Sequence, residues 1–107
     1  MQKEFDDLGR FSDPSLLILS SLASGSKHGY AMILDIEGFS GVRLEPGTLY
    51  GALARLEQRG WIEPLAAEER RRPYRLSAAG AQVLRRQLDS MQRVVRVGLK
   101  RLPAAQT

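Results

Sequence analysis

The chain has 107 residues, of which 43% are hydrophobic and 26% charged, and its formal net charge at pH 7 is +4. This size and composition are typical of one compact domain, which excludes a disordered or low-complexity protein. The sequence contains no cysteine and no apolar run of the roughly 18 residues that cross a bilayer, which excludes a disulfide framework, a cysteine nucleophile, a cysteine-based metal site and a membrane-spanning helix.

The positive charge is concentrated in the second half of the chain. Residues 1–13 carry two basic and four acidic side chains, whereas residues 81–107 carry six basic and one acidic side chain. The excess of cations favours an anionic partner, although a net charge of this size also serves solubility. The mixed charges of residues 1–13 exclude a signal peptide, so we expect a cytoplasmic protein with no membrane partner.

The first predicted helix begins at Pro14, after an N-terminal extension of residues 1–13. Asp13 is placed to accept a backbone N–H as the N-cap, and proline fits the first helical position. The following residues up to Ala23 are almost all apolar, so we expect this helix to be buried on most sides. The sequence Ser24-Gly25-Ser26 should end it.

The second predicted helix begins at Lys27 or His28 and runs to Phe39, with Gly38 and Gly41 as its stop signals. Apolar residues at helical spacing give this helix an apolar stripe, which comprises Tyr30, Ile33, Leu34 and Ile36.

The third helix has the clearest pattern. Pro46 fits its first turn, and Gly60 follows Arg59 as a C-terminal glycine after a terminal cation. Its buried face consists of leucines at helical spacing, namely Leu49, Leu53 and Leu56. The opposite face is small and polar near the N-terminus and cationic further along; it consists of Thr48, Tyr50, Gly51, Ala54, Arg55 and Gln58.

A β-hairpin follows the third helix. We expect strands at Trp61–Leu65 and Pro73–Leu76, joined by a polar loop from Ala66 to Arg72. The loop carries an arginine cluster, residues 70–72, at its end. Because two strands alone are marginally stable, the hairpin must pack against the helices.

Ser77 should cap a long last helix over residues 78–102, roughly 37 Å in length. Pro103 ends it, and residues 103–107 form a tail. An apolar stripe with nearly coiled-coil spacing predicts a dimer interface formed by Leu84, Leu88, Met91, Val95, Leu99 and Leu102. Burying these side chains is worth on the order of 10–20 kcal/mol per chain, against an association cost of about 4–15 kcal/mol, and part of this face must cover the first helix of its own chain.

Three short helices followed by a hairpin predict a mostly α fold, a winged helix-turn-helix domain over residues 14–77 with a dimerisation helix over residues 78–102. A DNA major groove about 12 Å wide admits one helix, and the small outer face of the third helix suits close approach. Arg55 could reach a phosphate or a guanine, and the basic loop a backbone or minor groove. For each residue alone, close packing or simple solvation is an equally good interpretation.

Four motifs in this order resemble the PadR family of bacterial winged-helix transcriptional regulators. They are Lys27-His28-Gly29-Tyr30, the run from Pro46 to Glu57, Gly60-Trp61-Ile62 and the run from Arg72 to Gly80. The resemblance covers roughly residues 14–102 and matches the branch with a single long C-terminal helix. The chain departs from the pattern at Trp61, where an aliphatic residue is more usual; we interpret Trp61 as a packing residue.

The resemblance implies a homodimer that binds a pseudo-palindromic operator in double-stranded DNA at the nucleoid, usually as a repressor. By similarity the second helix begins near the DNA backbone, the third helix enters the major groove and the hairpin forms the wing. Together with the basic loop, the expected DNA-binding residues are Lys27, His28, Tyr30, Thr48, Tyr50, Gly51, Arg55, Arg70, Arg71, Arg72 and Tyr74.

Two other classes of function remain to be compared. The single histidine, His28, has no cysteine, second histidine or phosphate-binding glycine loop to act with, so we expect no enzyme, no catalytic residue, no cofactor and no metal site. The alternative is a winged-helix module that binds proteins without specific DNA recognition. It would show no DNA binding even at low salt.

Two further expectations concern the dimer. The last helix has no aromatic residue on its inward face, which argues against a flat aromatic effector held between aromatic rings; a small apolar effector at the interface stays open. In the N-terminal extension, Phe5, Leu8 and Phe11 could pack against the partner's long helix or belong to a frayed tail.

Overall fold

The computed structural model describes residues 13–104 of the chain. The expectations for Phe5, Leu8 and Phe11, and for the end of the tail, lie outside this range. The described elements are, in chain order, α2 (Pro14–Leu22), α3 (Gly29–Ser40), α4 (Pro46–Gln58), β1 (Ile62–Pro64), β2 (Tyr74–Leu76) and α5 (Ala78–Arg101). The predicted fold, mostly helical with a small β-hairpin, is confirmed.

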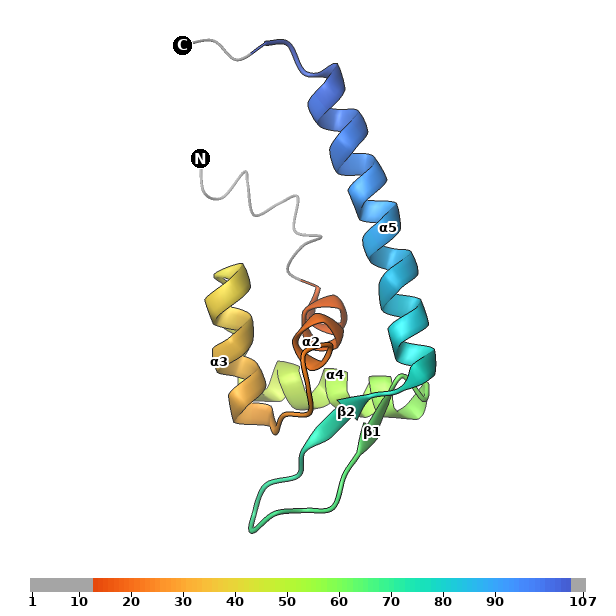
Figure 1. The fold of residues 1–107 in the computed structure, drawn as a ribbon. Helices are drawn as coiled ribbons and strands as arrows, with labels where there is room; N and C mark the ends of the chain where they lie inside the picture. Colours follow the sequence, from red (N-terminus) through yellow and green to blue (C-terminus); the bar gives the residue numbers. More distant parts are fainter. Residues whose placement is uncertain (1–12, 105–107) are drawn as a thin grey trace.

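Helix α2 lies at the centre of the core. Asp13 Oδ1 accepts the Ser15 N–H at 2.9 Å, as expected of an N-cap. The helix packs against α3, α4 and α5, which explains why almost every side chain after Pro14 is apolar (Figure 1). Ser21 is its one buried polar residue, and the Ser21 hydroxyl donates to Asp35 Oδ2 at 2.7 Å.

The apolar stripe predicted for α3 is buried only in part. Its buried side chains are Met32, Ile33 and Ile36, whereas Tyr30 is 57% exposed and Leu34 is 47% exposed. Each of these two lies one position, about 100° around the helix, beyond a buried residue. The apolar stripe of α3 therefore contributes Ile33 and Ile36 to the core, while Tyr30 and Leu34 remain exposed. Gly38 is inside the helix, and the left-handed Gly41 (φ 75°) ends it.

Helix α4 follows its predicted pattern. Leu49, Leu53 and Leu56 are buried, and Gly60 adopts φ 75° just after the helix. The next residue, Trp61, is half-buried against the core, and the Arg59 guanidinium lies 5.0 Å from the centre of its ring. This agrees with the expected packing role of Trp61.

The hairpin, residues 62–76 and called the wing below, has shorter strands than predicted. The strands pair antiparallel, with Ile62 opposite Leu76 and Pro64 opposite Tyr74. The wing also pairs with the segment before α3, because Lys27 and Tyr74 exchange two backbone hydrogen bonds of 3.1 and 3.0 Å. These bonds attach the two-stranded hairpin to the helical body, as its marginal stability requires.

Helix α5 rises from one end of α4, on the side opposite the wing tip (Figure 1). The Ser77 hydroxyl accepts the Gly80 N–H at 3.0 Å, so the predicted N-cap is confirmed. The only buried residues of α5 are Gly80 and Leu84. Leu84 is 6% exposed in the single chain and belongs to its core, because the start of α5 lies over α2. Leu84 therefore packs within its own chain, as part of this apolar face was expected to do.

Candidate nucleic-acid interface

The outward face of α4 is open along its length. Thr48, Tyr50 and Arg55 are exposed, while Gly51 is half-buried. The side chain of Glu45 does not cap the helix, so the N–H groups of the exposed first turn are free to meet an anionic acceptor. The Arg55 guanidinium extends back along the helix, since a Cβ built on Gly51 would lie 3.7 Å from Arg55 Nη1.

Tyr50 links this face to the start of α3. A Cβ built on Gly29 would lie 2.5 Å from Tyr50 Oη and 3.1 Å from Leu49 Cδ2, so only glycine admits this close approach. The Tyr50 ring is nevertheless 54% exposed and remains available to a partner. Gly29 stands inside the first matched motif, but its approach to Tyr50 was not expected from the sequence.

Tyr74 joins the wing to α4. Burial raises the pKa of the Tyr74 phenol, the Glu57 carboxylate of α4 and Tyr50 raise it further, and Arg72 opposes them. Tyr74 is half-buried against the core, which places the base of the wing beside α4. Arg72 has a second role within the wing, because its Nη1 donates to the Leu65 carbonyl at 2.8 Å and ties the two arms together.

The wing tip meets the N-terminus of α3 through an arginine and a histidine. His28 Nδ1 accepts the Ala31 N–H at 3.3 Å as the N-cap, so the neutral ring carries its proton on Nε2. Arg71 Nη1 lies 3.2 Å from that Nε2. The arginine and the histidine thus lie side by side in a depression that Glu68 and Glu69 also line.

The turn at the wing tip is tight and polar. Glu68 and Arg71 exchange backbone hydrogen bonds of 2.7 and 2.9 Å, which leaves Glu69 and Arg70 as the two central residues. Glu69 adopts φ 57°, a left-handed conformation that two-residue hairpin turns require. Arg70 is exposed at the tip.

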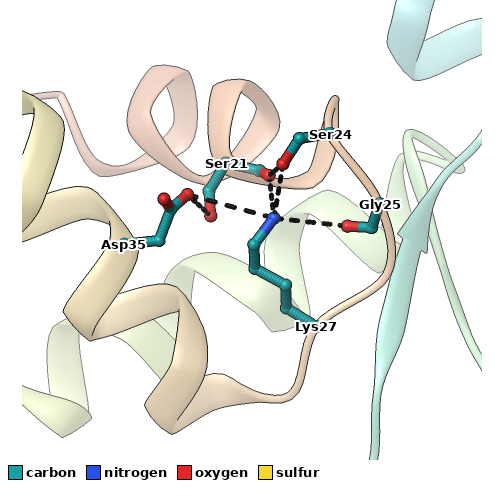
Figure 2. Close-up of polar contacts among 5 residues, drawn as sticks. All are labelled: Ser21, Ser24, Gly25, Lys27 and Asp35. Carbon is teal, nitrogen blue, oxygen red and sulfur yellow. Dashed lines mark hydrogen bonds and ion pairs between the residues drawn. The ribbon is translucent and has the colours of Figure 1, made fainter.

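Lys27 has a structural role that the sequence analysis missed. Its ammonium donates to the Ser21 carbonyl at 2.5 Å, to Ser24 Oγ at 2.8 Å and to the Gly25 carbonyl at 3.5 Å, and lies 3.9 Å from Asp35 Oδ2 (Figure 2). The side chain is 18% exposed. The cation therefore caps the C-terminus of α2, where unpaired carbonyls favour positive charge.

The expected site residues thus fall into three groups. The exposed face of α4, the start of α3 and the wing are brought together by the Tyr50–Gly29, His28–Arg71 and Lys27–Tyr74 contacts. The Lys27 side chain turns away, toward the end of α2. The surface, called the α4–wing surface below, is formed by His28, Tyr30, Thr48, Tyr50, Gly51, Arg55, Arg70, Arg71, Arg72 and Tyr74.

Among the described residues, 13–104, no cluster of His, Cys, Asp and Glu side chains could hold a metal ion. Within the same range no helix is long and apolar enough to cross a membrane.

Solved structures share this arrangement of three helices, a wing and a long last helix. A transcriptional regulator from Clostridium thermocellum has a TM-score of 0.72 at 29% identity, over 83% of this chain and 92% of that chain. A PadR family transcription regulator from Clostridium difficile has a TM-score of 0.74 at 25% identity, over 81% and 95% of the two chains. A PadR family regulator from Eggerthella lenta has a TM-score of 0.69 at 25% identity, over 97% and 99%.

Fold and site together define a winged-helix transcriptional regulator. The model of the transcriptional regulator PadR-like family matches residues 18–86, and the chain belongs to this family. The resemblance predicted from the four motifs is confirmed. A 37.1 kDa protein of a Streptomyces fradiae transposon is 48% identical over 85 residues, which are 79% of this chain and 25% of that protein. The chain thus spans a quarter of the length of this curated relative.

Proposed function

We propose that the protein is a DNA-binding repressor that acts as a homodimer on an inverted-repeat operator. One observation carries the proposal: the exposed face of α4 and the basic wing both contact the start of α3, through Tyr50–Gly29 and Arg71–His28. Helix α4 enters the major groove, while the wing follows the neighbouring backbone or minor groove. This geometry suits the reading of base edges by one helix and of phosphates by flanking cations.

The α4–wing surface divides these tasks between its residues. Thr48, Tyr50 and Gly51 lie near the start of α4, where a recognition helix reaches the base edges. Arg55 lies further along and is placed to bind a guanine or a phosphate. His28, Tyr30 and the wing residues 70–72 and 74 bind the sugar–phosphate backbone, which supplies most of the affinity.

Lys27 enters this proposal in a different role. Its ammonium is engaged by the end of α2, while its backbone pairs with Tyr74 of the wing. It therefore supports DNA binding by holding α2, α3 and the wing together rather than by touching a phosphate.

Helix α5 supplies the proposed dimer interface. Beyond Leu84 its apolar stripe is largely uncovered in the single chain: Met91 is half-buried, and Leu88, Val95, Leu99 and Leu102 are exposed. Burying such side chains is worth roughly 1.5–3 kcal/mol each. Burial of the stripe in a dimer therefore offsets much of the association cost of about 4–15 kcal/mol. Two α4 helices about 34–36 Å apart then reach successive major grooves on one face of the duplex.

The lining of this interface also bears on effectors. The stripe of α5 is aliphatic apart from Met91, so an effector held between the two α5 helices would be a small apolar molecule rather than a stacked aromatic one. Such a molecule would regulate by favouring a different separation of the two α4 helices.

The test begins with selection of bound duplexes from a random DNA library, followed by gel shifts of the selected sequence at 50 and 200 mM salt. We expect an inverted repeat whose binding weakens at the higher salt by orders of magnitude. Analytical ultracentrifugation should show a dimer. Failure to retain any duplex at low salt would overturn the proposal and favour the protein-interaction module.

A further inference from the structure

The first turn of α5 is joined directly to the end of α4. The Trp61 N–H donates to the Leu56 carbonyl at 3.1 Å, so Trp61 continues the end of α4 as a rigid piece. The Ser77 N–H in turn donates to the Trp61 carbonyl at 3.1 Å, and the Ser77 hydroxyl donates to the Gly60 carbonyl at 2.6 Å. Ser77 is also the N-cap of α5, so one residue is bonded to both helices.

We call these contacts between the end of α4 (Gly60 and Trp61) and the start of α5 (Ser77 and Gly80) the joint. Gly80 lets the two helices approach more closely at the joint than any residue with a Cβ would allow. A Cβ built on Gly80 would overlap the Trp61 carbonyl oxygen, and would lie 2.8 Å from the Trp61 carbonyl carbon and 3.0 Å from Leu76 Cδ1. Two of these three atoms are backbone and cannot rotate aside. Relief of the overlap therefore requires the start of α5 to move by at least about 1 Å.

Little else fixes the direction of α5. Gly80 and Leu84 are its only buried residues, and the rest of the helix extends beyond the body of the domain (Figure 1). Gly80 and Leu84 are about 6 Å apart along the axis, and Leu84 is about 26 Å from Arg101. A displacement of about 1 Å at Gly80, with Leu84 as pivot, thus becomes about 4 Å at the far end. That exceeds the rise of about 3.4 Å per base pair.

We infer that Gly80 and Ser77 set the spacing of the two operator half-sites that the dimer accepts. This inference rests on the proposed function, since it needs α5 as the dimer contact and α4 as the recognition helix. The joint fixes the angle between these two helices in each chain, and two-fold symmetry applies the same angle to both α4 helices. Gly80 and Ser77 act here as specificity-determining residues although neither lies on the α4–wing surface.

The experiment uses the inverted repeat selected by the wild-type protein, rebuilt as a series of duplexes whose half-sites are moved apart or together one base pair at a time. Binding of each duplex is measured by fluorescence anisotropy for the wild type, Gly80→Ala, Ser77→Ala and Gly38→Ala. The last is a matched control, because Gly38 is helical and a Cβ there meets nothing within 4 Å. Ultracentrifugation and circular dichroism verify that each variant is a folded dimer.

For Gly80→Ala we expect the preferred spacing to move by at least one base pair, so that the ratio of affinities for the old and new spacing falls at least about tenfold. Ser77→Ala keeps the close approach but removes the Gly60 hydrogen bond, so its preference should flatten without moving. Gly38→Ala should reproduce the wild-type profile.

The outcomes separate the two proposals. A wild-type protein that selects no inverted repeat contradicts the proposed function itself. A wild type with a sharp optimum, shared unchanged by folded Gly80→Ala and Ser77→Ala, leaves that function standing and overturns the role of the joint. If Gly80→Ala does not fold, Ser77→Ala decides alone: a flattened profile supports the inference, and an unchanged one refutes it.

Discussion

The phenol of Tyr50, on the outward face of α4, lies directly over the backbone of Gly29 in the first turn of α3, so that a Cβ on Gly29 would stand 2.5 Å from Tyr50 Oη. The contact holds an exposed aromatic side chain in one position at the start of the proposed recognition helix. A binding residue fixed before the partner arrives loses less conformational entropy on binding. Under the proposed function, the glycine acts on DNA recognition through its neighbour.

Gly29→Ala should displace Tyr50 and weaken operator binding by about 1–2 kcal/mol, a cost comparable to the loss of one good base contact. Anisotropy titrations of the selected duplex measure the effect. Gly38→Ala, in the same helix but facing open space, should bind like the wild type and raise the unfolding free energy by about 0.5–1 kcal/mol. Equal operator affinities for the two variants would remove Gly29 from the site.

Arg55→Ala should weaken operator binding by about 1–3 kcal/mol while the protein stays dimeric. The salt dependence then tells which partner Arg55 binds. Loss of a phosphate contact lowers the slope of log K against log salt by about 0.9, whereas loss of a guanine contact relaxes the preference at one base pair. A variant that keeps wild-type affinity, slope and base preference would show that Arg55 does not touch the DNA.

Lys27 and Arg70 are both cationic, but we expect their removal to affect different properties, namely stability for Lys27 and the salt dependence of DNA binding for Arg70. Lys27→Met removes the cation at the end of α2, so it should lower the unfolding free energy by about 1–3 kcal/mol and leave the salt slope unchanged. Arg70→Met, at the exposed wing tip, should lower the slope by about 0.9 and leave stability unchanged. Thermal unfolding and salt titrations of both variants make the comparison, and a reduced slope for Lys27→Met would mean that its ammonium does reach a phosphate.

Leu88 and Leu84 lie one turn apart on α5 but differ in burial. Leu88→Asp places a charge in the proposed interface, and it should yield a folded monomer that no longer binds the operator. Leu84→Ala should instead destabilise each chain by about 2–5 kcal/mol, because Leu84 belongs to the core of the domain. Sedimentation velocity distinguishes them; a dimeric Leu88→Asp would show that the interface lies elsewhere.

Tyr74 predicts a pH dependence at the base of the wing. Because its pKa in the folded chain is raised above the ordinary value of 10.0, folding favours the neutral phenol. That contribution to stability is complete below the unfolded pKa and is lost as the pH rises through the folded one. Tyr74→Phe should therefore lessen the fall in Tm as the pH rises above the ordinary pKa of 10.0.

Local chemistry explains why much of the fold could be predicted. Asp13 and Ser77 each cap a helix with their own side chain, and Gly60 ends α4 in a left-handed conformation. Such signals act over a few residues and are visible in any window of the sequence. The leucine period of α4 likewise predicts which face is buried and therefore which face is outward.

The candidate site was predictable only in part. The exposed face of α4 and the arginines of the wing could be predicted from the local sequence. Exposed polar residues need no distant partner within the chain, so their position in the helix or loop is enough to predict them. The approach of Gly29 to Tyr50 and of His28 to Arg71 joins residues 21 and 43 positions apart. No local pattern encodes such a distance, since it depends on how the helices cross.

By itself the sequence determined the N-caps of α2 and α5, the end of α4, which side of α4 faces outward, and the family to which the chain belongs. Only the tertiary structure decided that the Lys27 ammonium turns inward to α2, that α3 buries Met32 instead of Tyr30, and that Leu84 serves the core of its own chain. The physical reason is that capping and periodicity depend on neighbouring residues. Burial and ion pairing depend on which distant segments share the same space.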